Sequence, residues 1–272
     1  MLSRDAADSI RLSIVIPAYN EADRILPYLN SIAAYLESRN HPYEVLVVDD
    51  GSEDGTAAVV ERFSQSHAEV ELIRLPARKG KGAAVRRGMQ AAVGQFQLFT
   101  DADGATPIEE LARLEDAIAR GADLAIGSRA LASRLPDFLV QARLYRTILG
   151  GLFNQAVRQG GIQGISDTQC GFKLFRRTVA GDLFGVSTID GYGFDLEVLY
   201  VAQRRGYRIA EVPVNWADQP GSKVRVLRDG LAMMRELAII RQNDHKGLYS
   251  IPSFPHHFAA RRSTNLGFPI NR

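Results

Sequence analysis

The chain has 272 residues, 46% of them hydrophobic, which is enough to form the core of one large α/β domain or two small ones. A formal net charge of +2 does not indicate a nucleic-acid-binding protein. With Cys170 as its single cysteine, no apolar signal segment at its N-terminus and no apolar run of the ~18 residues that span a bilayer, we expect a cytoplasmic chain that lies at most on the membrane surface.

The first half of the chain alternates strand and helix signals. We expect strands at 12–17, 43–52, 70–75, 96–101 and 122–129. We expect helices at 21–38, 55–66 and 81–92 and from Pro107 onward, with Asp54 capping the second of them. Because these strands are apolar along their whole length, the pattern predicts a mostly parallel central sheet with helices on both faces.

The second half is less regular. It predicts a long helix at 135–158, strands at 167–177 and 207–216, and helices at 192–205 and 226–242. From Asn243 onward the composition turns polar and includes prolines, which is typical of a poorly packed tail. We therefore expect a single α/β domain over residues 1–243 and a polar C-terminal tail over residues 244–272.

Three expected strands end in polar loops, at 17–23, 49–56 and 101–107. Ligands of open α/β sheets bind beyond the carboxyl ends of the strands, although polar residues there also serve as turns and helix caps. Asp101 and Asp103 are separated by one residue, and carboxylates this close repel each other unless a cation compensates them. Mg²⁺ or Mn²⁺ suits such oxygen ligands and commonly bridges them to phosphates, so the loop predicts a nucleotide diphosphate ligand.

These stretches resemble family 2 of the inverting glycosyltransferases. The similar segments are LSIVIPAYNEADRI (12–25), EVLVVDDGSEDGT (44–56), RKGKGAAVRRGM (78–89) and the DXD motif Asp101-Ala102-Asp103. Four more segments resemble the subgroup that transfers sugars to polyprenyl phosphates: GSR (127–129), DTQCGFKLF (167–175), GYGFDLEVL (191–199) and GSKVR (221–225). DADGAT and DTQCGFKLF are most similar to the dolichyl-phosphate β-glucosyltransferases within that subgroup.

The resemblance implies the GT-A fold, a nucleotide-sugar-binding α/β sandwich. It also implies an enzyme, a hexosyltransferase that moves glucose from UDP-glucose to a polyprenyl or dolichyl phosphate with Mg²⁺ or Mn²⁺ as cofactor. In relatives that make mannosyl lipids, a glutamine two positions after the second aspartate joins the metal. Ala105 stands there in this chain, which favours the glucosyl subgroup.

Donor contacts are implied residue by residue. Pro17, Tyr19 and Glu21 match positions that contact base and ribose, and Asp49 or Asp50 matches the acid that pairs with the base edge. Lys81 matches a basic side chain near the nucleotide, although a solvated lysine at a helix start has the same appearance. Asp101 and Asp103 match sugar and metal contacts, with Ala102 between them and Asp103 the better metal ligand.

Other matched positions concern phosphates and catalysis. Arg129 matches an arginine that meets the phosphates of donor or acceptor, and Lys223 and Arg225 match a mobile lid over the diphosphate. Asp167 has three readings: it positions sugar or acceptor, acts as general base, or caps a turn. A phosphate monoester has a second pKa of about 6 and needs little help from a base, which favours positioning.

An acceptor with a prenyl tail stays in the membrane, and residues 135–158 suggest how the chain reaches it. Apolar residues of this segment fall on one broad helical face, and its arginines supply cations. This composition is typical of an amphipathic helix at the headgroup level, on the cytoplasmic face of a membrane. The alternative is a helix that packs on the sheet with solvated arginines.

Other functions stay open. The acceptor could be a saccharide or another hydroxyl compound, or the chain could be a non-catalytic nucleotide-sugar-binding scaffold. A dinucleotide-dependent oxidoreductase is disfavoured because Gly80, Gly82 and Gly88 lack the required spacing, and the GxxxxGK[ST] motif of phosphate-binding NTPases is absent from the sequence.

Overall fold

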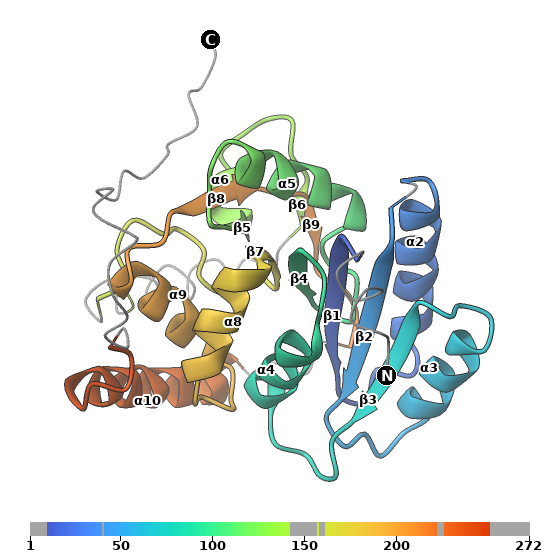
Figure 1. The fold of residues 1–272 in the computed structure, drawn as a ribbon, viewed down its shortest axis with the longest axis horizontal. Coiled ribbons are helices and arrows are strands. Elements are labelled where there is room, and N and C mark those ends of the chain that lie inside the picture. The colour runs from blue at the N-terminus through green and yellow to red at the C-terminus, as the bar shows by residue number, and fades with distance from the viewer. Residues whose placement is uncertain (1–9, 40, 142–156, 158–160, 222–225, 251–272) are drawn as a thin grey trace.

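The computed structural model describes residues 10–39, 41–141, 157, 161–221 and 226–250 (Figure 1). Its centre is a seven-stranded sheet in the order β3-β2-β1-β4-β7-β5-β8. The strands are β1 (Leu12–Ala18), β2 (Tyr43–Asp49), β3 (Val70–Arg74), β4 (Phe96–Thr100), β5 (Leu124–Ser128), β7 (Phe172–Arg176) and β8 (Ile209–Pro213). β7 runs antiparallel to β4 and β5, and the other neighbours pair in parallel. The predicted α/β fold with a mostly parallel sheet is confirmed.

Helices cover both faces of the sheet. α2 (Ile25–Glu37), α3 (Thr56–Ser64) and α5 (Leu111–Ala119), the last preceded by the 3₁₀ turn η1 (Ile108–Glu110), pack on one face. α4 (Lys81–Ala91), α8 (Arg177–Val186), α9 (Phe194–Arg204) and α10 (Val226–His245) gather on the other face (Figure 1). A short helix, α6 (Arg129–Ala132), follows β5 directly, and a small second sheet pairs β6 (Val140–Gln141) with β9 (Trp216–Ala217).

The central strands are apolar at successive positions because both faces of the sheet are covered. Ile14 and Ile16 of β1 enter the core under α2, whereas Val15 between them enters the core under α4. β2 repeats this with Val47 on the first side and Val48 on the second. Successive strand residues point to opposite faces, so a sheet covered on both faces needs an apolar side chain at every step.

The long helix predicted at 135–158 is wrong for its first seven residues. Residues 135–139 form turns and irregular structure, and Val140 and Gln141 form β6. Leu139 of this segment bonds to a distant part of the chain. Its N–H donates to Asn215 Oδ1 at 2.8 Å, and its carbonyl accepts from the Trp216 N–H at 2.9 Å. Residues 142–156 and 158–160 of that prediction lie outside the described residues.

The packed part of the chain extends past the predicted boundary at residue 243. α10 continues to His245, and Tyr249 is fully buried. The Tyr249 hydroxyl donates to Glu197 Oε1 on α9 at 2.6 Å, so a buried carboxylate binds this end of the chain to the core. Residues 251–272 of the expected tail lie outside the described residues. No helix in the described ranges is long and apolar enough to cross a bilayer.

Candidate functional site

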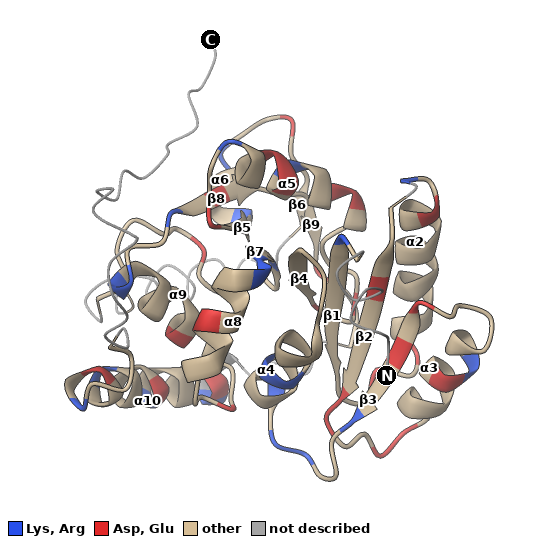
Figure 2. Ribbon diagram, in the orientation of Figure 1, with Lys and Arg blue, Asp and Glu red and all other residues tan. Residues whose placement is uncertain are grey.

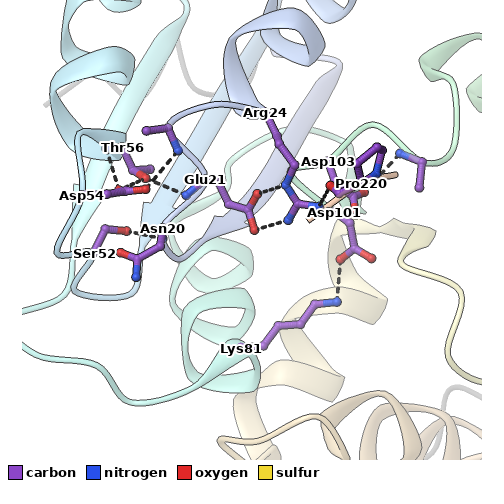
Figure 3. Close-up of polar contacts among 12 residues, drawn as sticks. Asn20, Glu21, Arg24, Ser52, Asp54, Thr56, Lys81, Asp101, Asp103 and Pro220 are labelled. Carbon is purple, nitrogen blue, oxygen red and sulfur yellow. Dashed lines mark hydrogen bonds and ion pairs between the residues drawn. The ribbon is translucent and has the colours of Figure 1, made fainter. Parts of the chain in front are cut away.

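Three polar loops meet at one edge of the sheet. β1 pairs in parallel with both β2 and β4, so the loops that follow these strands emerge on the same side. Figure 3 shows the result: Asn20 and Glu21 from the first loop, Ser52 and Asp54 from the second, and Asp101 and Asp103 from the third lie next to one another. The structure therefore brings together the three loops that the sequence singled out.

The first two loops are locked to each other. The Asn20 N–H donates to Ser52 Oγ at 2.9 Å, and the Glu53 N–H donates to Asn20 Oδ1 at 2.8 Å. Asn20 has a φ of 54°, a left-handed conformation that asparagine tolerates better than most residues. The Glu21 N–H donates to Thr56 Oγ1 at 2.7 Å, and Asp54 Oδ1 accepts from the Thr56 N–H at 2.9 Å. The loops thus form a preorganised unit before any ligand arrives.

Asp49 and Asp50, predicted to meet the base, are buried and bonded to backbone. Asp49 Oδ1 accepts from the Ser52 N–H at 3.0 Å. Asp50 accepts from the N–H groups of Lys79 and Gly80 at 2.7 and 2.9 Å and so fixes the loop that leads into α4. Sequence reasoning missed this structural role. The base contact stays a prediction, and it relies on the remaining lone pairs of these oxygens.

The basic loop before α4 borders the same edge (Figure 2). The Arg78 guanidinium lies 4.0 Å from the centre of the Tyr19 ring. Pro17 is buried within β1, and Tyr19 is half-buried just beyond it. At Gly80, φ is +121° and a Cβ would lie 2.4 Å from the Asp190 carbonyl oxygen, so only glycine fits between the loop and the segment before α9.

Asp101 and Asp103 follow β4, each facing a different cation. Lys81 Nζ lies 2.5 Å from Asp101 Oδ1, whereas Arg24 Nη1 lies 3.6 Å from Asp103 Oδ2 (Figure 3). Arg24 is mainly engaged elsewhere, because it forms a bidentate pair with Glu21 at 2.7 and 2.6 Å and donates to the Pro220 carbonyl at 3.2 Å. Asp103 is therefore the less compensated carboxylate of the two.

The pKa shifts agree with this asymmetry. Burial and the nearby charge of Asp101 raise the pKa of Asp103. Burial alone would lower the pKa of Lys81, but the carboxylates of Asp101 and Asp195 outweigh it and the net shift is upward. Lys81 therefore stays protonated. A further positive charge near Asp103 would stabilise the ionised form of its carboxylate.

These two carboxylates fit a metal that is completed by its substrate. Within the described ranges, no group of three or more His, Cys, Asp or Glu side chains could hold a metal ion. Mg²⁺ and Mn²⁺ commonly bind through one or two carboxylates and take their other ligands from water and phosphate. The donor set of Asp101 and Asp103 and the raised pKa of Asp103 match that half-site.

Gly171 of the DTQCGF stretch lies directly against Asp101. The Asp101 N–H donates to the Gly171 carbonyl at 3.1 Å. A Cβ on Gly171 would lie 2.1 Å from Asp101 Oδ2, so any other residue would displace the carboxylate. Ala102 and Ala105 are buried, and the Ala105 N–H donates to Asp103 Oδ1 at 3.1 Å. The glycine of this motif thus has a steric explanation.

Arg129 and Asp167 form a bidentate ion pair at the same edge. Arg129 Nε and Nη2 each lie 2.7 Å from an oxygen of Asp167, and the Arg129 N–H donates to the same carboxylate at 3.0 Å. The Asp167 N–H in turn donates to Glu211 Oε1 at 2.8 Å. Burial raises the pKa of Asp167, but Arg129 outweighs it and the net shift is downward, which makes this carboxylate a weak proton acceptor.

Two predicted site residues lie outside the part of the chain that the structure describes, and two arginines at the site were not predicted. Lys223 and Arg225 lie outside the described residues. Arg24 and Arg78 were not singled out as site residues by the sequence, although each lies within a stretch that resembles the family. The spacing of Glu21 and Arg24, three residues apart at a helix start, was the available signal for their ion pair.

Comparisons with known proteins agree with this arrangement. Residues 13–184 match the family described as Glycosyl transferase family 2. A dolichyl-phosphate beta-glucosyltransferase of Drosophila melanogaster is 39% identical over 251 residues, 88% of this chain and 76% of the relative. Enzymes with the same description from Dictyostelium discoideum (35%, covering 92% of this chain and 80% of the relative) and Homo sapiens (37%, covering 85% and 75%) are similar.

Solved structures support the fold. Glucosyl-3-phosphoglycerate synthase from Mycobacterium tuberculosis, in complex with UDP, superposes with a TM-score of 0.62 at 21% sequence identity, covering 92% of this chain and 83% of that one. Mannosyl-3-phosphoglycerate synthase from Rubrobacter xylanophilus gives a TM-score of 0.61 at 22% identity, covering 90% and 79%. At this identity the likeness concerns the fold alone.

Proposed function

Because this chain belongs to glycosyl transferase family 2 and is a glycosyltransferase, we propose that it transfers glucose from UDP-glucose to dolichyl phosphate or another polyprenyl phosphate, with inversion at the anomeric carbon. The observation that carries the proposal is the juxtaposition of Asp101, Asp103 and Lys81 with the loops after β1 and β2 (Figure 3). The names of the relatives at 35–39% identity support the donor sugar and the acceptor.

The acidic pair would hold the cofactor. When bound by Asp101 and Asp103, Mg²⁺ or Mn²⁺ would act as a Lewis acid on the leaving diphosphate. The M. tuberculosis synthase has been crystallised with Mn²⁺ and UDP-glucose, which supports a divalent metal here. Gly171 leaves the space that the Asp101 carboxylate occupies, and the Asp103 carboxylate is held from one side by the Ala105 N–H.

Three cations of the chain would serve the diphosphate end. Lys81 lies at the first residue of α4, and it neutralises Asp101 in the described structure. A diphosphate at this helix start would offer Lys81 a second anionic partner, and it would lie at the positive end of the helix dipole. Lys223 and Arg225, predicted to form a lid over the diphosphate, remain part of this proposal from sequence alone.

The acceptor end relies on Arg129 and Asp167. A phosphate acceptor is already largely ionised near neutral pH and attacks without a strong base. Asp167 is committed to Arg129 by two hydrogen bonds at 2.7 Å, so its most useful action is to hold the guanidinium in one orientation toward an anionic group. This supports the positioning role over the base role.

We place the enzyme at the cytoplasmic face of a membrane, because a prenyl-tailed acceptor does not leave the bilayer. Flotation with anionic liposomes that weakens at high salt is the expected result. Full recovery in the soluble fraction at low salt would contradict the location while leaving the reaction intact.

The test of the reaction is release of nucleoside diphosphate from a panel of sugar nucleotides, with and without divalent metal and a short polyprenyl phosphate. UDP release from UDP-glucose that requires both additions supports the proposal. UDP release stimulated by a saccharide but not by the prenyl phosphate would move the acceptor to a hydroxyl compound. Binding of UDP-glucose without turnover under any condition would indicate a scaffold.

A further inference from the structure

Lys173 is a charged residue in the middle of the sheet. Its side chain is 1% exposed, and its strand neighbours Phe172 and Leu174 are fully buried. Lysine is almost never fully buried without a partner. The partner here is Asp195, in the first turn of α9, whose carboxylate is 4% exposed and accepts a hydrogen bond from Lys173 Nζ.

Such a pair is weak evidence for stability. Removing two charges from water is unfavourable, and apolar residues of similar volume often replace a buried ion pair without loss of stability. The strand around Lys173 shows that apolar side chains suit this region. A reason other than stability is therefore needed for a lysine at this position.

The location of Lys173 points to the active site. β7 lies between β4 and β5, and Lys173 is directly opposite Phe99, two residues before Asp101. Lys173 Nζ is 5.9 Å and Lys81 Nζ is 5.4 Å from the centre of the Phe99 ring. The negative charge of Asp195 also raises the pKa of Lys81. Positive and negative groups therefore alternate from the interior pair to the acidic pair at the surface.

Lys173 also holds a particular turn. Its ammonium donates a second hydrogen bond, 3.0 Å long, to the carbonyl of Thr168. The turn 167–171 begins with Asp167, which orients Arg129, and ends with Gly171, which lies against Asp101. One interior ammonium thus connects α9 to a turn that touches both the acidic pair and the arginine at the acceptor end.

We propose that Lys173 and Asp195 are positioning residues for glycosyl transfer: they fix the turn 167–171 so that Asp101 and Arg129 keep their relative places. The inference rests on the proposed function, because it takes Asp101 and Arg129 as parts of the active site. Neither Lys173 nor Asp195 touches the substrates in this scheme. They act through the turn, and their removal should change the rate of the chemical step more than the affinity for the donor.

The test compares the full-length wild-type chain with the joint variant Lys173→Met/Asp195→Leu, using UDP-glucose, Mg²⁺ or Mn²⁺ and a short polyprenyl phosphate. Because both charges are removed together, we expect near wild-type thermal unfolding. We expect kcat to fall on the order of 100-fold, as a displacement of about 1 Å at a reacting centre does. KM for UDP-glucose should stay within about threefold, because the loops after β1 and β2 do not depend on the pair.

Arg205→Met is the matched control. Arg205 is 3% exposed, pairs with Asp182 and lies at the opposite end of α9, about 15 Å from Asp195 along the helix axis. The Arg205→Met variant should unfold more easily than the wild-type chain and should retain the wild-type kcat. If the joint variant does not fold, the isosteric Asp195→Asn gives the same comparison of kcat and KM.

A kcat within about threefold of wild type in the folded joint variant, or in Asp195→Asn if that variant is used, would overturn the inference and leave the proposed function standing. An equal loss of kcat in Arg205→Met would also overturn it, because the effect would then be a general response to a lost interior cation. A wild-type chain that releases no UDP under any condition removes the proposed function itself, and the inference with it.

Discussion

The two carboxylate sites at the edge of the sheet are compensated in opposite ways. Asp167 has a guanidinium bound through two hydrogen bonds of 2.7 Å, and its pKa is lowered. Asp103 faces Arg24 at 3.6 Å, and its pKa is raised by burial and by Asp101. A fully compensated carboxylate is suited to holding another protein group in place, whereas an undercompensated one is suited to receiving a cation from outside.

The largest effect should come from the undercompensated site. Asp103→Ala is expected to reduce UDP release by at least ~10³-fold, because it removes a ligand of the cation that stabilises the leaving group. Thermal unfolding should be unchanged or slightly improved, since the variant also removes a repulsive charge. Glu53→Ala, an exposed carboxylate on the same rim, is the control and should retain normal turnover. Near-normal activity in Asp103→Ala would remove the central claim.

Gly171→Ala moves the acidic site without touching its charges. The new methyl group would lie 2.1 Å from Asp101 Oδ2, so the carboxylate must shift, and we expect kcat to fall about 100-fold. The free energy of unfolding should change little, because the displaced atoms are the end of a partly exposed side chain.

Gly185→Ala is the control for this substitution. Gly185 lies inside α8, and a methyl group added there would meet nothing within 4 Å. Alanine at this position should therefore raise stability by roughly 0.5–1 kcal/mol and leave kcat unchanged. If Gly171→Ala behaves in the same way, the close approach to Asp101 has no functional importance.

The compensated site should respond mainly through stability. Asp167→Asn leaves Arg129 without its anionic partner, and because that arginine is partly exposed we expect a loss of about 1–3 kcal/mol in unfolding free energy. With a prenyl phosphate acceptor, kcat should fall only about tenfold, since no proton needs to be removed. A loss beyond ~10³-fold would instead favour Asp167 as a general base.

The same variant makes a pH prediction. Asp167 has a folded-state pKa below its unfolded value of about 3.9, so its contribution is complete above that value and is lost as the pH falls through the folded pKa. The stability difference between wild type and Asp167→Asn should therefore be constant at neutral pH and shrink below about pH 4. Denaturant titrations at several pH values measure it. A difference that persists undiminished in acid would contradict the lowered pKa.

The last contrast between the two sites is metal stabilisation without substrate. Mg²⁺ or Mn²⁺ at 100 times its dissociation constant should stabilise the wild-type chain by about 2.7 kcal/mol, and should leave Asp103→Ala and Asp103→Asn unaffected. Thermal unfolding with and without the metal measures this. Equal stabilisation of all three proteins would place the metal elsewhere and end the contrast between the two carboxylate sites.

Local sequence patterns predicted much of the fold because the first half of the chain is locally consistent. Every expected strand from residue 12 to residue 129 is present, since a doubly covered sheet requires the uninterrupted apolar runs that the sequence contains. α8 was missed because RTVAGDLFGV is short, carries two glycines and follows β7 without a turn. The pairing of β6 with β9 was missed because nothing near that segment signals a partner so distant in the sequence.

The site was predicted as a set of residues but not as a set of pairs. The spacing of Asp101 and Asp103 predicted a need for positive charge, yet Lys81 and Arg24 became their neighbours only through the parallel order of β1, β2 and β4. Sequence patterns also gave no warning that Asp50 would be used by backbone N–H groups. Ion pairs between distant segments depend on topology, which local periodicity does not encode.

The antiparallel insertion of β7 has a consequence for the order of folding. β2 pairs with β1 and β3, and β1 also pairs with β4, so the first four strands need no later segment, whereas β4 acquires its second neighbour only when β7 has been made. Contacts with large sequence separation form slowly, because the loop between them must close first. During synthesis, the first half can collapse while β4 still has one open edge, a surface that invites unwanted strand pairing until β7 covers it. The strand that follows the turn beside Asp101 is thus also the strand that covers the open edge of β4.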